Sequence, residues 1–400
     1  MIRLGTFQCD ITPPPGYPLC GGAHPPLKQV RDPLYGRGLL LDDGEKRLLL
    51  CSLEFTQLSD APHVELRDAL AAAAETTTDL VSVHCVHQHD APMVDKEPGN
   101  GEIAGNGSHR DWWARVVRGL RDVVERARGD LRPVRTVGVG EARVFHCASN
   151  RRLVGADGKV WESRWSRGNS ADVQAWPIGT IDPFLRSMTF WGEGEDDLLA
   201  SMSYYNSHPQ TADGRGAASA DAPGEALRLL GEQYPGAHHM YFSGCVGDIT
   251  FGKYTSSDTE ENIRVFGARL GDGAGRAIAQ SRASRTAVTG FDWTTTEWLV
   301  PWREEAADTS AQDRPARLAL LELAGARVLH SMGELFVEYQ LAAQAMRPDE
   351  FVALAGLGDP VHTYVPTADA FAEGGYEVKV TRTTAEAEGR LKAAMSRLLA

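Results

Sequence analysis

The most informative group of reactive side chains is the run Val-His-Gln-His-Asp at residues 86–90. Residues two apart on a strand point to the same side, so His87 and His89 are expected to project together from the end of a buried strand. Two imidazoles on one face suit a metal ion, or a ligand together with a proton-transfer partner. The pattern is short, however, and a surface loop can carry the same spacing without either role.

Two further candidates stand where apolar segments end. His208 lies in Asn206-Ser-His-Pro209, directly after the apolar run 198–206, and Glu334 lies where a strand is expected to give way to a helix. Binding and catalytic residues are concentrated at such junctions. Each residue also has an ordinary alternative, because a lone histidine often only completes hydrogen bonds and a glutamate in a first helical turn complements the helix dipole.

Two tyrosines near the C-terminal end complete the set of candidates. Tyr364 lies in the segment 362–367 and Tyr376 in the segment 372–377, both of which contain glycine or proline. A buried tyrosine usually does no more than satisfy its hydroxyl group inside a core. Taken one at a time, these signals do not distinguish a site from a core.

The elements around the paired histidines are predicted from apolar patterning. The run 46–54 is continuously apolar at its centre, as expected of a strand covered on both faces. Residues 61–74 are typical of a helix and residues 80–89 of a β-branched strand, so a β-α-β unit is predicted with its histidines at the strand's carboxyl end. A second helix is predicted after Ser108, which forms a capping box with Asp111.

Strands and helices alternate along the rest of the chain. Strands are expected near 134–146, 184–191, 198–206, 238–243, 291–300, 317–323 and 327–332, and helices near 222–233, 260–280, 334–346 and 384–399. Two irregular stretches, 13–33 and 155–179, are expected to be long ordered loops, which often carry function. The alternation predicts a mixed α/β fold.

Composition restricts the classes of partner. The chain has 400 residues, 42% of them hydrophobic and 24% charged, with a mean hydropathy of -0.30. Its 54 acidic and 41 basic residues give a net charge of -13, which disfavours a nucleic-acid partner, and no basic amphipathic stretch indicates stable membrane association. These values are typical of a soluble globular protein.

Cysteine usage and the chain's first residues bear on its compartment. The six cysteines include no C-x-x-C pair, so free thiols in a reducing compartment are expected. The first residues lack the pattern of a signal peptide, and no apolar run approaches the length that spans a bilayer. We therefore expect a cytoplasmic protein.

Short motifs follow one another along nearly the whole chain. They are Asp10-Ile-Thr-Pro13 with Cys20-Gly-Gly22, Val30-Arg-Asp-Pro-Leu34, His87-Gln-His-Asp-Ala-Pro92, Ser149-Asn-Arg151, Asn206-Ser-His-Pro209, Asp221-Ala-Pro-Gly224, Gly244-Cys-Val-Gly-Asp248, Gly333-Glu334, and Tyr364-Val-Pro-Thr367 with Gly374-Gly-Tyr-Glu377. In this order they resemble the N-terminal catalytic domain of the neutral (non-lysosomal) ceramidase family. The agreement in order is more informative than any single motif.

The resemblance implies a fold, a cofactor and a set of site residues. The fold would be α/β of the mixed α+β type, with central mixed β-sheets flanked by helices and residues 1–400 forming a single domain. A zinc ion would be held by His87, His208, Glu334 and Tyr364. His89, Arg151 and Tyr376 would face the substrate, although a structural salt bridge is the alternative role for Arg151.

The activity implied is zinc-dependent hydrolysis of an amide (N-acyl) bond, with Tyr376 at the developing oxyanion and His89 giving a proton to the leaving amine. Several positions depart from the family's motifs: Gln88, Asp90 and Ala91 replace its Thr, Ser and Gly, and its G-D-x-S-P-N is Gly247-Asp-Ile-Thr-Phe-Gly252 here. His362 precedes Tyr364 where the family usually has glycine.

Substrate and bond type are less constrained than the chemistry. The chain shows neither the signal sequence nor the C-terminal β-rich domain of secreted ceramidases, so a small soluble substrate, as in specialised metabolism, is expected rather than a bilayer lipid. One alternative is a zinc enzyme that acts on an ester or lactone, or that catalyses a non-hydrolytic step at the same site. Another is a non-catalytic metal-binding protein. Oligomeric state is left open.

Overall fold

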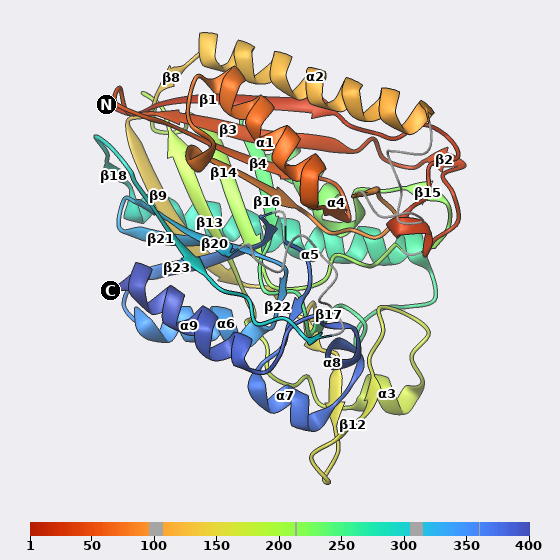
Figure 1. Cartoon of the computed structure of the whole chain (residues 1–400). Coiled ribbons are helices and arrows are strands. Elements are labelled where there is room, and N and C mark those ends of the chain that lie inside the picture. The colour runs from red at the N-terminus through yellow and green to blue at the C-terminus, as the bar shows by residue number, and fades with distance from the viewer. Residues whose placement is uncertain (96–106, 213, 305–314, 360) are drawn as a thin grey trace.

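Two β-sheets packed face to face, with helices on their outer sides, make up the architecture of the chain (Figure 1). A computed structural model describes residues 1–95, 107–212, 214–304, 315–359 and 361–400. This arrangement of mixed sheets flanked by helices confirms the predicted α/β fold class.

The larger sheet has nine strands in the described part of the chain. Their spatial order is β19 (Asp292–Trp298), β20 (Ala316–Leu323), β21 (Ala326–Met332), β23 (Phe351–Gly358), β6 (Val81–Cys85), β4 (Arg47–Leu53), β3 (Tyr35–Asp42), β1 (Arg3–Asp10) and β8 (Arg132–Pro133). Strands from the two ends of the chain meet in its middle, where β23 joins β6 through the single pair Gly358 and His84.

The smaller sheet comes from the middle of the chain. Its order is β16 (His238–Ser243), β14 (Leu198–Tyr205), β13 (Phe184–Trp191), β9 (Thr136–Arg143) and β18 (Thr286–Ala287). Leu48 and Leu50 of β4 share a buried cluster with Met202 of β14 and Phe242 of β16. Because alternate side chains of a strand face opposite ways, the two sheets bury these inner faces against each other.

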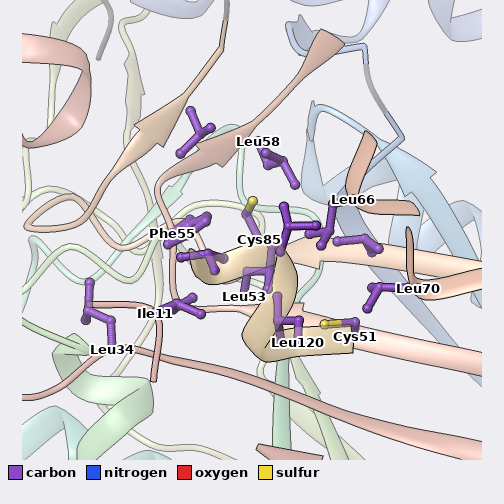
Figure 2. Packing of buried hydrophobic residues seen from close by; sticks show 14 of the residues in the cluster. Ile11, Leu34, Cys51, Leu53, Phe55, Leu58, Leu66, Leu70, Cys85 and Leu120 are labelled. Atoms are coloured by element: carbon purple, nitrogen blue, oxygen red, sulfur yellow. The ribbon is translucent and has the colours of Figure 1, made fainter. Parts of the chain in front are cut away.

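Six helices cover the outer faces in the described part of the chain: α1 (Asp60–Ala74), α2 (Gly107–Gly129), α4 (Asp221–Gln233), α5 (Thr259–Ser281), α6 (Val337–Met346) and α9 (Glu386–Leu399). The short helices α3 (Ala171–Ala175), α7 (Ala368–Glu373) and α8 (Tyr376–Val380) lie outside these layers. Leu66 and Leu70 of α1 and Leu120 of α2 share a buried cluster with Leu53 of β4 and Cys85 of β6, at the strand ends that lead to the histidines (Figure 2). Helices α4 and α5 pack against the smaller sheet, and α6 and α9 against the β20 and β23 side of the larger one.

Short pairs of strands join segments that are distant in sequence. They are β22 (Glu334–Leu335) with β24 (Tyr364–Val365), β10 (Ser149–Asn150) with β17 (Ile249–Thr250), β5 (Gln57–Leu58) with β7 (Met93–Val94), β2 (Gln29–Val30) with β15 (Ala217–Ala218), and β11 (Arg152–Val154) with β12 (Val160–Ser163). Single turns of 3-10 helix occur at η1 (Cys20–Gly22), η2 (Thr78–Leu80) and η3 (Arg282–Ser284).

Most local predictions hold, but strand β23 was not predicted, and the stretch 155–179, expected to be a loop, contains β12 and α3. The remaining differences lie at element ends. The β-α-β unit is confirmed, since β4 and β6 run parallel with α1 between them. The strand predicted at 80–89 is too long, because β6 ends at Cys85 and the chain then turns with His87 at a φ of 76°. Ser108 lies inside α2 rather than at its cap, so the predicted capping box is wrong.

Two chemical expectations can also be compared with the structure. All six cysteines are free thiols, as the absence of C-x-x-C pairs predicts. Within the described residues, we find no helix that has both the length and the apolar character needed to cross a bilayer.

Candidate active site

His87 and His208 are each fixed by the backbone. The Nδ1 atom of His87 lies 2.6 Å from the carbonyl oxygen of Thr56, and the Nδ1 atom of His208 lies 2.6 Å from the carbonyl oxygen of Val246. A carbonyl oxygen can only accept, so both rings carry their proton on Nδ1. When the rings are neutral, both Nε2 atoms therefore present a lone pair, and both point toward Glu334.

Glu334 is the point at which the histidines converge. Its Oε2 atom lies 3.4 Å from His87 Nε2 and 2.9 Å from His208 Nε2, and its side chain is 4% exposed. Its other oxygen, Oε1, lies 3.1 Å from His362 Nε2. Burial alone would raise the pKa of this carboxyl group, but the three histidines hold the pKa well below its usual range.

This arrangement fits a bound cation. With neutral rings, the lone pairs of two imidazoles and a carboxylate would face one another, which is repulsive unless a proton or a cation lies among them. Imidazole nitrogen and carboxylate oxygen are ligands that Zn²⁺ takes in proteins. A second grouping overlaps this one, since one ligand atom each from His87, His89 and His208 all lie within 4.8 Å of one another.

Tyr364 completes the predicted ligand set. Strand pairing places Glu334 of β22 directly opposite Tyr364 of β24, so the Tyr364 hydroxyl lies near the Glu334 carboxylate. The Tyr364 ring stacks on the His208 ring at 6.5 Å with an interplanar angle of 22°. Burial and Glu334 raise the pKa of this hydroxyl well above its usual value, against the opposing effect of Arg151.

Arg151 lies behind the two tyrosines. Its guanidinium carbon lies 5.4 Å from the ring centre of Tyr364 and 5.5 Å from that of Tyr376, within the range of a cation–π contact. Its Nε atom donates to Glu377 Oε1 over 2.6 Å, so the salt bridge considered as its alternative role is also present. One terminal nitrogen, Nη2, is buried and has no hydrogen-bond partner among the described residues.

Tyr376 is the most accessible of the candidate residues. It is the first residue of α8 and remains 38% exposed. Its ring lies 6.0 Å from the Tyr364 ring and 5.3 Å from the Trp165 ring. Partial burial raises the pKa of its hydroxyl, which keeps the group protonated and able to donate a hydrogen bond.

His89 lies beside the candidate ligands, but it does not share a strand face with His87 as predicted. It follows β6 in a loop, and its ring stands at 87° to the His87 ring with 5.3 Å between centres. Its Nδ1 atom lies 2.9 Å from Gln210 Nε2, while its Nε2 atom is buried without a hydrogen-bond partner in the described part of the chain. Burial and the neighbouring His87 and His208 lower the pKa of His89 well below its usual value.

Two glycines allow the ligand segments to approach. Gly333 has a φ of 68°, and a Cβ there would lie 2.5 Å from the carbonyl oxygen of Thr363, on the strand that carries Tyr364. A Cβ on Gly247 would lie 2.5 Å from the carbonyl oxygen of Glu334. Close backbone approach at both positions requires a residue without a side chain.

The structure thus brings together the seven residues that the sequence pointed to, and it adds others. His362 contacts Glu334, Gln210 contacts His89, and Cys20 and His24 form a second group of potential ligands with His89. His362 stands two residues before Tyr364, which is the one signal that could have identified it in advance. Nothing in the spacing of Cys20, His24 and Gln210 relates them to the histidine pair.

Solved structures share this fold. The neutral ceramidase from Pseudomonas aeruginosa matches with a TM-score of 0.76 and 14% sequence identity, covering 100% of this chain and 74% of that chain. A ceramidase complexed with C2 matches with a TM-score of 0.77, 14% identity and the same coverage of each chain. The sequence itself matches no protein-family model and no curated protein. At this level of identity the likeness concerns the fold, which is ceramidase-like over the full length of the chain.

Proposed function

We propose that this protein is a zinc-dependent hydrolase that cleaves an amide (N-acyl) bond of a small soluble molecule. One observation carries the proposal: His87 and His208 donate through Nδ1 to backbone carbonyls and turn their Nε2 lone pairs toward the Glu334 carboxylate. Two imidazoles, a carboxylate and the adjoining Tyr364 hydroxyl form a donor set suited to zinc. The ceramidase-like fold supports the same reaction class, since the matched structures are ceramidases.

The proposed ligands bind the metal, and the residues around them act on the substrate. Zinc bound by the four predicted ligands supplies a Lewis acid and lowers the pKa of water. Tyr376 donates its hydroxyl proton in a hydrogen bond to the substrate carbonyl oxygen as negative charge develops there. Arg151, anchored by Glu377, holds a fixed positive charge behind the rings of Tyr364 and Tyr376.

His89 is the proposed proton carrier. Gln210 holds its Nδ1 atom, which leaves Nε2 as the atom that moves a proton to the departing amine nitrogen. The ring lies 6.0 Å from the His208 ring, so the proton would be delivered beside the ligands rather than from across the site. This nitrogen must be protonated because a deprotonated amine is a poor leaving group.

Side chains near His89 favour a polar substrate. Gln210, Asp90 and His24 surround this histidine, and Asp90 is buried. Trp165 and Tyr376 supply a partly exposed aromatic edge to the site. We propose that a small acyl group and a polar amine, rather than a long acyl chain, meet these groups.

Metal content and turnover together test the proposal. Purified protein should contain zinc by elemental analysis, and it should hydrolyse short N-acyl amines from a panel that also includes long-chain amides and the matched esters. His208→Ala should remove the zinc held at Glu334 and abolish the activity. Tyr376→Phe should retain the zinc and lose roughly 100-fold to 1000-fold in kcat, the effect of removing one oxyanion donor.

A control tyrosine variant and the esters in the substrate panel provide the outcomes that would contradict the proposal. Tyr254→Phe removes a hydroxyl from a tyrosine whose ring contacts His146, away from the site, and should leave both zinc and kcat unchanged. Zinc that is fully retained in His208→Ala would contradict the ligand assignment. Cleavage of the esters without any cleavage of the amides would contradict the bond assignment while leaving the metal site intact.

A further inference from the structure

A second group of metal-ligating side chains adjoins the first. One ligand atom each from Cys20, His24 and His89 all lie within 4.8 Å of one another, and all three residues are partly buried. Donor atoms around a tetrahedral zinc ion stand about 3.5 Å apart, given bond lengths of roughly 2.0 Å to nitrogen and 2.3 Å to sulfur. Side-chain adjustments alone are therefore enough to close this group around an ion.

The backbone fixes Cys20 against the histidine loop. The Cys20 N–H donates to the carbonyl oxygen of Ala91 over 2.9 Å, and Leu19 forms an isolated antiparallel bridge with Pro92. Cys20 adopts a φ of 47°, a left-handed conformation that a non-glycine residue seldom takes. These backbone contacts join the turn that carries Cys20 to the segment just after His89. They do not involve the thiol.

A buried carboxylate orients His24. Asp90 is 2% exposed, and its Oδ1 atom lies 3.1 Å from His24 Nδ1 and accepts a hydrogen bond from the Gly214 N–H. The Gly214 N–H also lies 3.2 Å from His24 Nδ1, so it is shared between that nitrogen and the carboxylate. Because the carboxylate is the stronger acceptor, we assign the ring proton to Nδ1 and the lone pair to Nε2. Metal-binding histidines commonly have such a carboxylate partner, which fixes the tautomer and raises the basicity of the ligand.

His89 can supply the third ligand through Nε2, the buried atom without a hydrogen-bond partner among the described residues. Binding there requires a proton on Nδ1 and an acceptor facing it. Gln210 meets this need if its amide turns over, because the oxygen and nitrogen of an amide exchange places without moving the rest of the side chain. Ser166, which contacts the Gln210 amide, can donate or accept and so accommodates either orientation.

From this geometry we propose that Cys20, His24 and His89 bind a second zinc-type divalent ion, separate from the ion at Glu334. A thiolate and two imidazoles suit a borderline-soft metal, and three protein ligands leave a coordination position open. Resting on the proposed function, this assignment makes the second ion inhibitory, because it occupies the Nε2 atom through which His89 would transfer a proton.

Cobalt provides a spectroscopic test that needs no substrate. Chelator-treated protein is titrated with Co²⁺, and bound metal is counted by elemental analysis after removal of excess ion. Wild-type protein should bind two ions per chain and show a thiolate-to-cobalt charge-transfer band. Cys20→Ser and His24→Ala should each lose one ion, and Cys20→Ser should lose the band.

Two variants show which site the signal belongs to. Cys9→Ser alters another partly buried cysteine, outside the ligand group, and should keep both ions and the band. His208→Ala should lose one ion and keep the band. The proposal is overturned if wild-type protein shows no band, if Cys20→Ser retains it, or if a single ion accounts for the band and is lost in His208→Ala.

Turnover adds a separate readout. Excess Zn²⁺ should inhibit the wild type and Cys9→Ser, and inhibition should disappear in Cys20→Ser. Failure of the proposed function is distinguishable, because a protein that hydrolyses no amide still binds two ions and shows the band. Inhibition that persists unchanged in Cys20→Ser would overturn the inhibitory role of this site.

Discussion

Glu334 occupies a position that the metal-free protein stabilises poorly. Its carboxylate faces the Nε2 lone pairs of His87 and His208, whose own protons are committed to backbone carbonyls. A buried acceptor surrounded by acceptors must take up either a proton or a cation. The local structure therefore favours either a proton or a metal ion at this point, and two imidazoles with a carboxylate are a donor set that suits a metal.

Glu334→Gln should separate metal binding from folding. The glutamine amide can donate to the histidine Nε2 atoms, so the metal-free variant should match or exceed the wild type in Tm. Loss of the carboxylate should weaken zinc binding by about 100-fold or more, by analogy with the 10-fold to 100-fold effects of changing groups that only support a ligand. Thermal scans with and without Zn²⁺ measure both quantities.

A nearby glutamate provides the control for that variant. Glu338 lies four residues further on, in α6, and contacts neither histidine ligand in the described structure. Glu338→Gln should keep the zinc-induced rise in Tm. A full zinc-induced rise in Glu334→Gln would show that the carboxylate is not a ligand.

The short pair of strands β22 and β24 sets the position of Glu334 opposite Tyr364. Gly333 precedes β22 in the left-handed region, with its α-carbon facing the carbonyl oxygen of Thr363. A side chain at Gly333 would push these two strands apart. The geometry of the proposed ligands thus depends on Gly333, which directly precedes the two-residue strand β22.

Gly333→Ala should lower both zinc affinity and Tm. Two effects contribute: about 1–2 kcal/mol of left-handed strain for a residue with a Cβ, and the 2.5 Å contact with Thr363. Gly325→Ala separates them, because Gly325 has a φ of 76° and its Cβ would meet no atom within 4 Å. Isothermal titration with Zn²⁺ should show weaker binding in the Gly333 variant alone, and equal affinity in both variants would contradict the proposed displacement.

Element prediction succeeded where a strand or helix has a simple apolar pattern. Strands β13 and β16 begin and end where the apolar runs predicted, since both are buried on two faces. Strand β23 was not foreseen, because its sequence Phe-Val-Ala-Leu-Ala-Gly-Leu-Gly mixes helix-favouring alanine and leucine with glycine. The predicted strand over 80–89 ran too far, because apolar content does not reveal where a chain turns away from a sheet.

Site prediction depended on motif order more than on local chemistry. His87 and His208 were found because histidines at the ends of apolar strands stand out in the sequence. The contact of His362 with Glu334 was missed because it arises when β22 pairs with β24, across residues that are far apart in sequence. Cys20 and His24 reach His89 through a bridge between loops, which periodicity does not encode.

Buried histidines at the centre of the larger sheet make the stability of the whole molecule depend on pH. A small cavity of about 20 Å³ lies where β6 meets β23. Burial lowers the pKa of His84 to about 4, with the Gly356 carbonyl opposing and Arg317 adding to the shift. The ionisable groups that face this cavity from the packed elements are His63 and Arg67 of α1, Arg317 of β20, His330 of β21, and Asp359.

Acidification should destabilise the protein through His84. With a pKa of about 4 when folded and about 6.5 when unfolded, His84 contributes stability above pH 6.5 that is lost as the pH falls toward 4. Between pH 7 and 5, the free energy of unfolding should fall by about 2 kcal/mol more in the wild type than in His84→Gln. Urea unfolding at both pH values measures the difference.

A variant of a surface histidine tests whether the pH dependence of stability comes from the burial of His84. His146 is exposed, so His146→Gln should follow the wild-type pH dependence. Identical slopes in the wild type and His84→Gln would show that His84 is protonated in the folded protein or contributes nothing to its pH dependence.

We propose that residues 1–400 form one cooperative unit. Strands near both ends of the chain share the larger sheet, the middle of the chain supplies the smaller sheet, and one buried cluster joins them. The proposed ligands also come from all three parts, at His87, His208, Glu334 and Tyr364. A cut between any two parts would expose an apolar sheet face and divide the metal site.

Thermal unfolding should accordingly be a single transition. Buried tryptophans report on each part, with Trp112 in α2, Trp191 in β13 and Trp298 in β19, so fluorescence and far-ultraviolet circular dichroism should give the same midpoint. Zinc at about 100 times its Kd should add roughly 2.7 kcal/mol to the whole transition. In His208→Ala the transition should stay single and lose the part of the zinc effect that comes from the ion at Glu334. Two separated midpoints, or a zinc effect confined to one probe, would mean that the sheets unfold independently and that the site does not link them.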